Sequence, residues 1–265
     1  MPDAIFVRDG ERFVPTDLAR GPWTPEAQHG GAPAALLARL VERFEGGEAM
    51  FVARLTIELL RPVPIAPLAA RTQLARPGRK VQLVAASLLS EDTEVVRATG
   101  LRIRKAEIPM PADLAHVAPP GPDHGEPSVS PWAETIEYRA FHNHGVEHRF
   151  VGGSFMRPGP ATDWIRLRVP LVDGEENSPL CRVAAAADFG NGVSWVLNRS
   201  DGYRFVNPDL TIYLHRLPVG EWVCLDAVTT VQPHGLGVTE SALFDEHGPI
   251  GRAVQSLIVE YDPLT

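Results

Sequence analysis

The sequence predicts an α+β protein made of two copies of one unit, in which a single helix is followed by four antiparallel strands. Three observations lead to this prediction: a repeat at a constant offset, one segment of helical spacing in each half, and strand-like runs after each such segment. With 265 residues, 44% of them hydrophobic, the chain can form one large domain or two small ones around a substantial core.

The repeat is clearest in two heptapeptides. LTIELLR at residues 55–61 and LTIYLHR at residues 210–216 agree at five of seven positions and start 155 residues apart. The dipeptide Arg-Ala occurs at Arg97 and again at Arg252, which is the same offset of 155 residues. Equal offsets at two distant places indicate that the two halves share one register, as expected of a duplicated domain.

Each half contains one helical segment and four strand-like runs. In the first half, small and apolar residues at helical spacing predict a helix from about Ala32 to Phe44. In the second half, Ser178 followed by Pro179 is typical of a helix start, and the alanine-rich segment after it is apolar. The predicted strands lie within residues 51–63, 68–78, 80–92 and 94–105 of the first half, and within 209–217, 221–232, 237–246 and 251–261 of the second.

The segment between the halves, residues 107–132, is rich in Pro and poor in apolar residues, so we expect an extended linker. The predicted domains are therefore an N-terminal unit at residues 1–106, this linker, and a C-terminal unit at residues 133–265. An apolar helix wrapped by a curled antiparallel sheet is the hotdog unit. Two such units can join their sheets edge to edge, so the sequence predicts a double hotdog.

Composition and missing motifs exclude several functions. The net charge is -8 with no block of Lys and Arg, so we expect no nucleic-acid partner. No apolar run reaches roughly 18 residues and no signal peptide is apparent, so we expect a cytoplasmic protein without membrane insertion. Cys181 and Cys224 lie far apart without CxxC spacing and are expected to be buried thiols. The chain has no GxGxxG or Walker motif, so we expect no cofactor.

A histidine-rich segment, HNHGVEH, contains His142, His144 and His148. A metal site is one interpretation, but the strand-like flanks and the lack of HExxH favour a solvated hairpin. Neither Ser154 nor Ser194 lies in a GxSxG motif, which argues against an α/β-hydrolase triad.

Asp188 follows four alanines, inside what reads as the second helix. One interpretation is an exposed Asp close to a helix end made by Gly190 and Gly192; the other is a charge held inside the protein for chemistry, and composition alone favours neither. At the offset of 155 residues, the counterpart of Asp188 in the first half is Pro33, so the first helix has no matching carboxylate.

Two amides accompany this carboxylate in the second half. Gln255 interrupts the apolar last strand, and its counterpart 155 residues earlier is Gly100, which favours a polar site in one half only. The alternative for Gln255 is an outward-facing side chain on an alternating strand. Asn207 precedes the first strand of this half, where the alternative is an Asn-Pro turn.

Several segments together resemble the acyl-CoA thioesterase II (TesB-like) family of double-hotdog proteins: QHGGAPAALLARLVE, ADFGNGVSW, FVNPDLTIYLHRLPVGEW and GRAVQSLIVEY. The resemblance covers nearly the whole chain apart from the linker. It implies thioester hydrolysis of an acyl-CoA by an Asp of the second helix, a Ser or Thr at the start of the following strand, and a Gln of the last strand. These positions fall on Asp188, Asn207 and Gln255, so that an amide replaces the hydroxyl.

Thioester hydrolysis needs a placed water, a base and donors aimed at the developing oxyanion. We expect Asp188 to act as the base and Gln255 to orient the water or bind the oxyanion. Asn207 can donate and accept hydrogen bonds but cannot act as a nucleophile, which favours direct attack by water. His29, Gly30 and Gly31 at the start of the first helix are candidates for substrate binding through free N–H groups, the alternative being a tight turn.

The leading hypothesis is an acyl-CoA thioesterase that converts a fatty or aryl acyl-CoA to the free acid and CoA. The alternative is a catalytically weak or inactive acyl-CoA binding protein, because Asn207 replaces the hydroxyl. A hydratase or dehydratase is disfavoured, since such enzymes pair an acid with a His and the second-half helix contains none. The two units in one chain allow a monomer, and a homo-oligomer is also possible.

Overall fold

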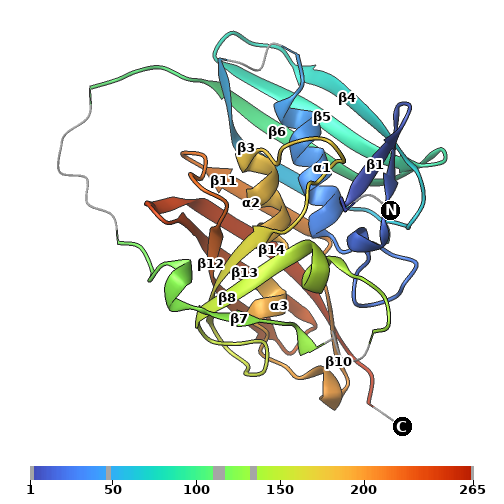
Figure 1. Cartoon of the computed structure of the whole chain (residues 1–265), viewed down its shortest axis with the longest axis vertical. Helices are drawn as coiled ribbons and strands as arrows, with labels where there is room; N and C mark the ends of the chain where they lie inside the picture. The colour runs from blue at the N-terminus through green and yellow to red at the C-terminus, as the bar shows by residue number, and fades with distance from the viewer. Residues whose placement is uncertain (1–2, 46–48, 110–116, 132–135, 264–265) are drawn as a thin grey trace.

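The computed structural model describes residues 3–45, 49–109, 117–131 and 136–263. The strands form one antiparallel sheet of 14 strands that curls around two central helices (Figure 1). The helices are α1 (Gly31–Glu42), α2 (Pro179–Ala187) and the short α3 (Gly190–Val193). The strands are β1 (Phe6–Asp9), β2 (Arg12–Pro15), β3 (Met50–Leu59), β4 (Leu68–Arg76), β5 (Val81–Ser90), β6 (Thr93–Arg104), β7 (Glu126–Ser128), β8 (Val146–Gly152), β9 (Ala161–Leu167), β10 (Tyr203–Val206), β11 (Asp209–Leu214), β12 (Val223–Gln232), β13 (Leu236–Asp245) and β14 (Gly248–Tyr261).

Both predicted helices are present, and the second is shorter than expected. The helix predicted from about Ala32 to Phe44 is α1, shifted by one to two residues. The start of α2 is as predicted: Ser178 Oγ accepts a hydrogen bond of 3.2 Å from the Cys181 N–H, and Pro179 occupies the first turn. Asp188 lies at the C-terminal cap of α2, so the expectation that it sits well inside the helix is wrong.

All eight predicted strands are present, as β3 to β6 and β11 to β14. The prediction of four strands per unit is nevertheless incomplete, because a hairpin precedes each helix. β1 pairs with β2 before α1, and β8 pairs with β9 before α2. These hairpins extend the sheet through β2 next to β4 and β9 next to β12.

An approximate twofold axis passes through the centre of the sheet, where β3 pairs with β11. Thr56 lies directly opposite Thr211, and these two residues are 155 positions apart in the sequence. The strand order β1-β2-β4-β5-β6-β3 on one side is mirrored by β8-β9-β12-β13-β14-β11 on the other. The sequence repeat is thus a symmetry of the sheet, and the two edges that meet at its centre are both paired.

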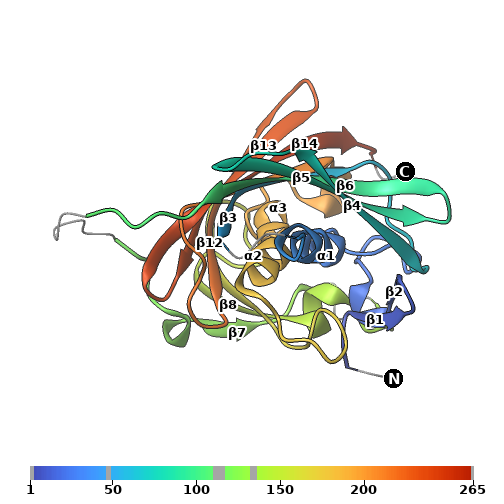
Figure 2. The same cartoon turned by 90° about the horizontal axis from the view of Figure 1, so that it is seen from above.

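The two helices pack against each other inside the sheet, as the end-on view of α1 shows (Figure 2). They run antiparallel: Gly31 at the start of α1 lies against Ala185 near the end of α2, while Arg39 near the end of α1 pairs with Glu175, just before α2, at 2.6 Å. The four alanines of α2, residues 184–187, are at most 1% exposed. They form a close-packed wall against the neighbouring helix and strands.

The offset of 155 residues holds for the strands but not for the helices. The N-terminal caps are Gly30 and Ser178, which are 148 residues apart. The helical counterpart of Asp188 is therefore Leu40, and the assignment of Pro33 to this position is wrong. The conclusion drawn from that assignment survives, because Leu40 is not a carboxylate either.

Part of the Pro-rich segment between the halves belongs to the sheet. β7 pairs with β8, and a short turn at Pro122–His124 precedes it. Trp164 Nε1 donates a hydrogen bond of 2.8 Å to the Pro120 carbonyl, which anchors the chain before this turn. Residues 110–116 and residue 132 of the segment lie outside the described residues.

Both cysteines are buried free thiols, as predicted. Burial raises the pKa of Cys181 to about 12 and also raises that of Cys224, so both stay protonated and unreactive. Among the described residues, none of the helices has the length and hydropathy that crossing a membrane requires.

Substitution of Gly100 in β6 tests how closely α1 packs against the sheet. A Cβ at this position would collide with Val41 Cγ1 of α1. We expect Gly100→Ala to lower the free energy of unfolding by about 1–3 kcal/mol, because overpacking forces neighbouring groups apart. Urea denaturation measures this loss.

The partner variant Val41→Ala removes the colliding methyl groups. We expect the double variant to be more stable than the sum of the two single losses predicts, because the two sites are in contact. Strict additivity would show that Gly100 does not provide room for α1.

Candidate active site

Four of the side chains that the sequence singled out converge at the end of α2. Asp188 is at the centre. Its Oδ2 lies 3.1 Å from His29 Nδ1, and its Oδ1 accepts a hydrogen bond of 2.9 Å from Asn207 Nδ2. Gln255 Nε2 donates to the Asp188 carbonyl at 3.1 Å and lies 3.4 Å from Oδ1. These residues come from four separate segments, which only the fold brings together.

The two glycines at the start of α1 give Asp188 its place. Gly30 has φ of -57° and Gly31 is not among the residues with positive φ, so neither is needed for an unusual turn. Instead, a Cβ on Gly30 would lie 2.8 Å from Asp188 Oδ2, and one on Gly31 would lie 2.7 Å from the Ala185 carbonyl. The glycines allow the start of α1 to approach the end of α2 closely, and this close approach, rather than a strained backbone in the turn at Gly30, is what requires glycine here.

Gln255 points inward from β14 and is 1% exposed, which rules out the outward-facing alternative. Its Oε1 accepts a hydrogen bond of 3.3 Å from the Asn191 N–H in α3. A Cβ on Gly190 would lie 2.9 Å from the same Oε1, so this glycine makes room for the amide. The contacts on both ends of the amide fix its orientation, with the NH₂ group toward Asp188.

A chain of buried hydroxyl groups packs against α3, and it was not predicted from the sequence. Ser194 Oγ donates to the Gly190 carbonyl at 2.8 Å and lies 2.8 Å from Thr229 Oγ1. Thr229 Oγ1 in turn lies 2.7 Å from Thr239 Oγ1, and Thr239 is the residue directly opposite Gln255 in the sheet. Hydroxyl residues at inward positions of β12 and β13 are the signal that could have predicted it.

The tautomer of His29 follows from its surroundings. Its Nδ1 lies 3.1 Å from both the Gly31 N–H and Asp188 Oδ2. One nitrogen cannot accept from the amide and donate to the carboxylate at the same time. We assign the proton to Nδ1, because the neighbouring carboxylate is ionised and the Gly31 N–H can also donate to it.

Asp188 is ionised at neutral pH although its side chain is only 6% exposed. Burial alone would raise its pKa, but hydrogen bonds from His29, Asn207 and the Gly31 N–H, together with the electrostatic interaction with His29, outweigh burial and leave the pKa of Asp188 lowered. The carboxylate is thus a proton acceptor in place, surrounded by donors that are suited to binding a water or an oxyanion.

The histidine-rich segment lies behind this site and is not a solvated hairpin. His142 and His148 are buried, and only His144 is exposed. His148 Nδ1 lies 2.6 Å from Asp163, and the Phe189 ring separates His148 from His29. Burial, with the nearby His29 and His148 charges, lowers the pKa of His142 to about 3, so this ring is neutral.

The buried pair His148–Asp163 was not predicted, because its residues come from two strands that the sequence analysis missed. Burial raises the pKa of Asp163, while the His148 charge and hydrogen bond oppose this rise. Among the described residues no group of three or more His, Cys, Asp or Glu side chains is arranged to hold a metal ion.

The symmetry-related position in the other half is apolar. The strand offset of 155 residues relates Asn207 to Val52 and Gln255 to Gly100. Gln255 of β14 contacts the end of α2, and in the other half Gly100 of β6 contacts Val41 of α1 at the corresponding place. The polar constellation therefore occurs at one end of the helix pair, in agreement with the asymmetry seen in the sequence.

The comparison with protein families matches both halves of the chain. The C-terminal domain of acyl-CoA thioesterases matches residues 111–259, and the N-terminal domain matches residues 19–103. The chain belongs to the acyl-CoA thioesterase family. It is therefore a thioester hydrolase with an acyl-CoA substrate, and the resemblance noted in the sequence is confirmed.

Solved structures show the same fold for this thioesterase. A proposed thioesterase II from Thermobifida fusca YX is 17% identical, with a TM-score of 0.74 over 96% of this chain and 95% of that one. A hot dog fold protein of unknown function from Alicyclobacillus acidocaldarius is 16% identical, with a TM-score of 0.71 over 99% and 98%. The acyl-CoA thioesterase II TesB2 from Mycobacterium marinum is 16% identical, with a TM-score of 0.66 over 95% and 94%. No curated protein matches the thioesterase.

Gly30→Ala tests whether the close approach of α1 positions the carboxylate. The added Cβ would displace Asp188 Oδ2, the movable end of a side chain, so we expect folding to survive and kcat/KM to fall by about 10–100-fold. Steady-state hydrolysis of an acyl-CoA measures the effect.

Gly192→Ala is the matched control, since a Cβ there meets nothing within 4 Å. We expect this variant to keep the activity of the parent. Equal activity of the two variants would show that the position of Asp188 does not depend on Gly30.

Proposed function

We propose that this thioesterase hydrolyses a fatty or aryl acyl-CoA to the free acid and CoA, with a water activated by Asp188. The observation that carries the proposal is the convergence of Asp188, Asn207 and Gln255 on one point, with His29 on the opposite side of the carboxylate. A buried ionised carboxylate surrounded by N–H donors is suited to general-base catalysis of this reaction.

In the proposed reaction, the water binds between the Asp188 carboxylate and the amides of Asn207 and Gln255. Asp188 takes one proton as the water oxygen attacks the acyl carbon, and the resulting oxyanion collapses to break the bond to sulfur. CoA leaves as a thiolate, whose conjugate thiol has a pKa of about 8.5, so its departure needs no strong acid. The proton on Asp188 then passes to the thiolate or to solvent.

Asn207 supports direct attack by water. Its Nδ2 already donates one hydrogen to Asp188 Oδ1, which leaves the second hydrogen for the water or the oxyanion. An amide cannot form an acyl-enzyme, so the reaction needs no covalent intermediate at this position. Asn207 thus keeps the hydrogen-bonding part of the role that a Ser or Thr hydroxyl would have.

We further propose that His29 and the Gly30 N–H contact the substrate. The Gly31 N–H is directed at His29 and Asp188, and the Ala32 N–H donates to the His29 carbonyl at 3.0 Å, so neither is free for substrate. The Gly30 N–H makes no hydrogen bond within the described part of the chain and lies at the positive end of α1. It is the backbone donor best placed for the thioester carbonyl.

In the proposed architecture, residues 1–106 and 133–265 are two hotdog units in tandem, connected by residues 107–132. The mirrored strand order and the central pairing of β3 with β11 support this division. Each unit supplies part of the site: the first contributes His29 and Gly30, and the second contributes the carboxylate and the two amides.

Asp188→Asn is the direct test of the base. We expect it to lower kcat by about 10²–10⁴-fold, because a general base contributes that much and an amide cannot accept the proton. Release of free CoA from acyl-CoAs of several chain lengths measures the rate and also defines the preferred acyl group.

Asp226→Asn is the matched control, since Asp226 is exposed on β12 and bonds only to Thr162 in the described structure. We expect wild-type activity from it. Equal rates for Asp188→Asn and the parent would reject Asp188 as the base. Tight binding without any CoA release by the parent would favour the alternative of an acyl-CoA binding protein.

The pH dependence of kcat distinguishes Asp188 from His29 as the proton acceptor. The active form of the base is the ionised one, and the pKa of Asp188 is lowered. We therefore expect kcat to stay constant from neutral pH down to about pH 4, the ordinary range of Asp, and to fall only below it. Chromatographic measurement of CoA release covers this range.

The same interactions stabilise the folded protein above the unfolded-state pKa of Asp188, and this contribution is lost as pH falls through the lowered folded-state value. Circular dichroism at each pH separates loss of activity from unfolding. An acidic limb of kcat near pH 6–7 in the folded protein would instead assign the proton transfer to an imidazole.

A further inference from the structure

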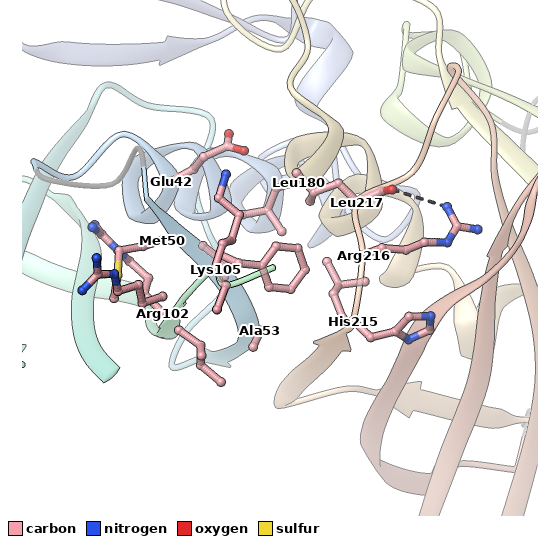
Figure 3. A pocket seen from close by; sticks show the side chains of 15 residues that line it. Glu42, Met50, Ala53, Arg102, Lys105, Leu180, His215, Arg216 and Leu217 are labelled. Atoms are coloured by element: carbon pink, nitrogen blue, oxygen red, sulfur yellow. Dashed lines mark hydrogen bonds between the residues drawn. The ribbon is translucent and has the colours of Figure 1, made fainter. Parts of the chain in front are cut away.

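A cavity lies at the opposite end of the helix pair from Asp188. Its volume is about 640 Å³, within the range of about 300–1,000 Å³ typical of small-molecule sites. Figure 3 shows that Glu42 of α1 and Leu180 of α2 lie on one side of it, with Met50 and Ala53 of β3 on the other. The cavity is thus built from the end of α1, the start of α2, the central strands β3 and β11, and the end of β6.

This cavity is the symmetry counterpart of the catalytic site. Val52, which lines it, is the counterpart of Asn207 at the offset of 155 residues. Leu180 lies in the first turn of α2, as His29 and Gly30 lie at the start of α1. The approximate twofold axis therefore relates this cavity to the place that the Asp188 constellation occupies in the other half, and the cavity lacks the carboxylate and amides that hydrolysis needs.

The floor of the cavity is apolar. Phe51, Val52, Leu180, Leu214 and Leu217 line it, and they come from β3, α2, β11 and the turn after β11. An alkyl chain placed here would remove apolar surface from water at about 25 cal/mol per Å². The cavity therefore suits an apolar chain rather than a sugar or a nucleotide.

One rim of the cavity is cationic. Arg102 and Arg104 lie at the end of β6 and Lys105 directly follows this strand, while Glu42 is the acidic side chain among the described lining residues. Arg104 and Lys105 are exposed and make no side-chain hydrogen bond or ion pair within the described part of the chain. In Figure 3 Lys105 lies in the middle of the cavity, between Glu42 and Arg102.

Arg102 adds an unused donor. It is 1% exposed, its Nη1 donates to the Phe44 carbonyl at 3.0 Å, and its Nε has no hydrogen-bond partner in the described structure. The other basic residues, His215 and Arg216, point away from the cavity in Figure 3, and Arg216 is paired with Asp245. The cations available to a ligand are those of β6.

We propose that this cavity is a non-catalytic binding site for a single-chain amphiphile with an anionic head group, whose alkyl chain lies on the apolar floor and whose head lies against Arg104 and Lys105. Two sources share this chemistry: a free fatty acid and an intact acyl-CoA. The site goes beyond the proposed hydrolysis and does not depend on it, because none of its residues belongs to the Asp188 constellation.

Calorimetric titration tests the site with two probes, dodecanoate and the non-hydrolysable thioether S-dodecyl-CoA. Arg104→Glu/Lys105→Glu reverses the rim charge, and Ala53→Trp fills the cavity. Arg71→Glu/Arg76→Glu is the matched control, because it makes the same charge change on exposed positions of β4. Release of CoA from a short-chain acyl-CoA is measured on every variant.

We expect the parent and the β4 control to bind one more equivalent of probe than Ala53→Trp and Arg104→Glu/Lys105→Glu do. If Arg104→Glu/Lys105→Glu still binds this equivalent, we expect its affinity to be about tenfold lower than that of the parent. CoA release is expected to be the same in all variants. An extra equivalent seen with dodecanoate identifies the free acid as a ligand, and one seen only with the thioether identifies acyl-CoA; both support the site. Identical binding by parent and cavity variants overturns it. A parallel loss of binding and CoA release also overturns it, because the probe would then occupy the catalytic site.

Discussion

The close antiparallel contact between the start of α1 and the end of α2 is the constraint on which the rest of the site depends. Without side chains at Gly30 and Gly31, the backbone of one helix reaches the last turn of the other. This contact places Asp188 at the positive end of α1 and beside His29, which compensates for burying the carboxylate. A charge that would be unstable in an apolar helix wall is thus retained in ionised form.

Much of the fold follows from the sequence because the repeat and the hydrophobic spacing reinforce each other. Alternating and β-branched runs predict the strands β3 to β6 and β11 to β14, and the constant offset of 155 residues relates the two sets. Ser178 with Pro179 predicts the start of α2 through capping chemistry. The two hairpins before the helices could not be predicted in this way, since they carry charged residues and lie outside the segments that the offset of 155 residues relates. The offset also fails in the helices, because the chain between each helix start and the strand that follows it is longer in the second half: α1 is followed by β3 after a short connection, whereas α3 and β10 lie between α2 and β11.

The sequence predicts most of the residues that form the site, but it does not predict which of them are in contact. Two features mark the polar end of the helix pair from sequence alone: the repeat counterpart of Gln255 in the other half is a glycine, and a carboxylate follows a run of alanines. The pairing of His29 with Asp188 spans two halves of the chain, so no local pattern reveals it. The same holds for His148 and Asp163, whose burial depends on the hairpin that the sequence analysis missed.

The amide at position 207 fits the chemistry of a thioester better than that of an ordinary ester. In the proposed mechanism Asp188 is a modest base because its pKa is lowered, and the hydrogen bond that Asn207 donates to Oδ1 contributes to this lowering. A thiolate leaves readily, so the barrier that remains is placing and deprotonating the water rather than expelling CoA. When the leaving group departs readily, a second hydrogen-bond donor that holds the water increases the rate of hydrolysis more than a stronger base would. The replacement of a hydroxyl by an amide is then compatible with hydrolysis by direct attack, and it excludes an acyl-enzyme at that residue.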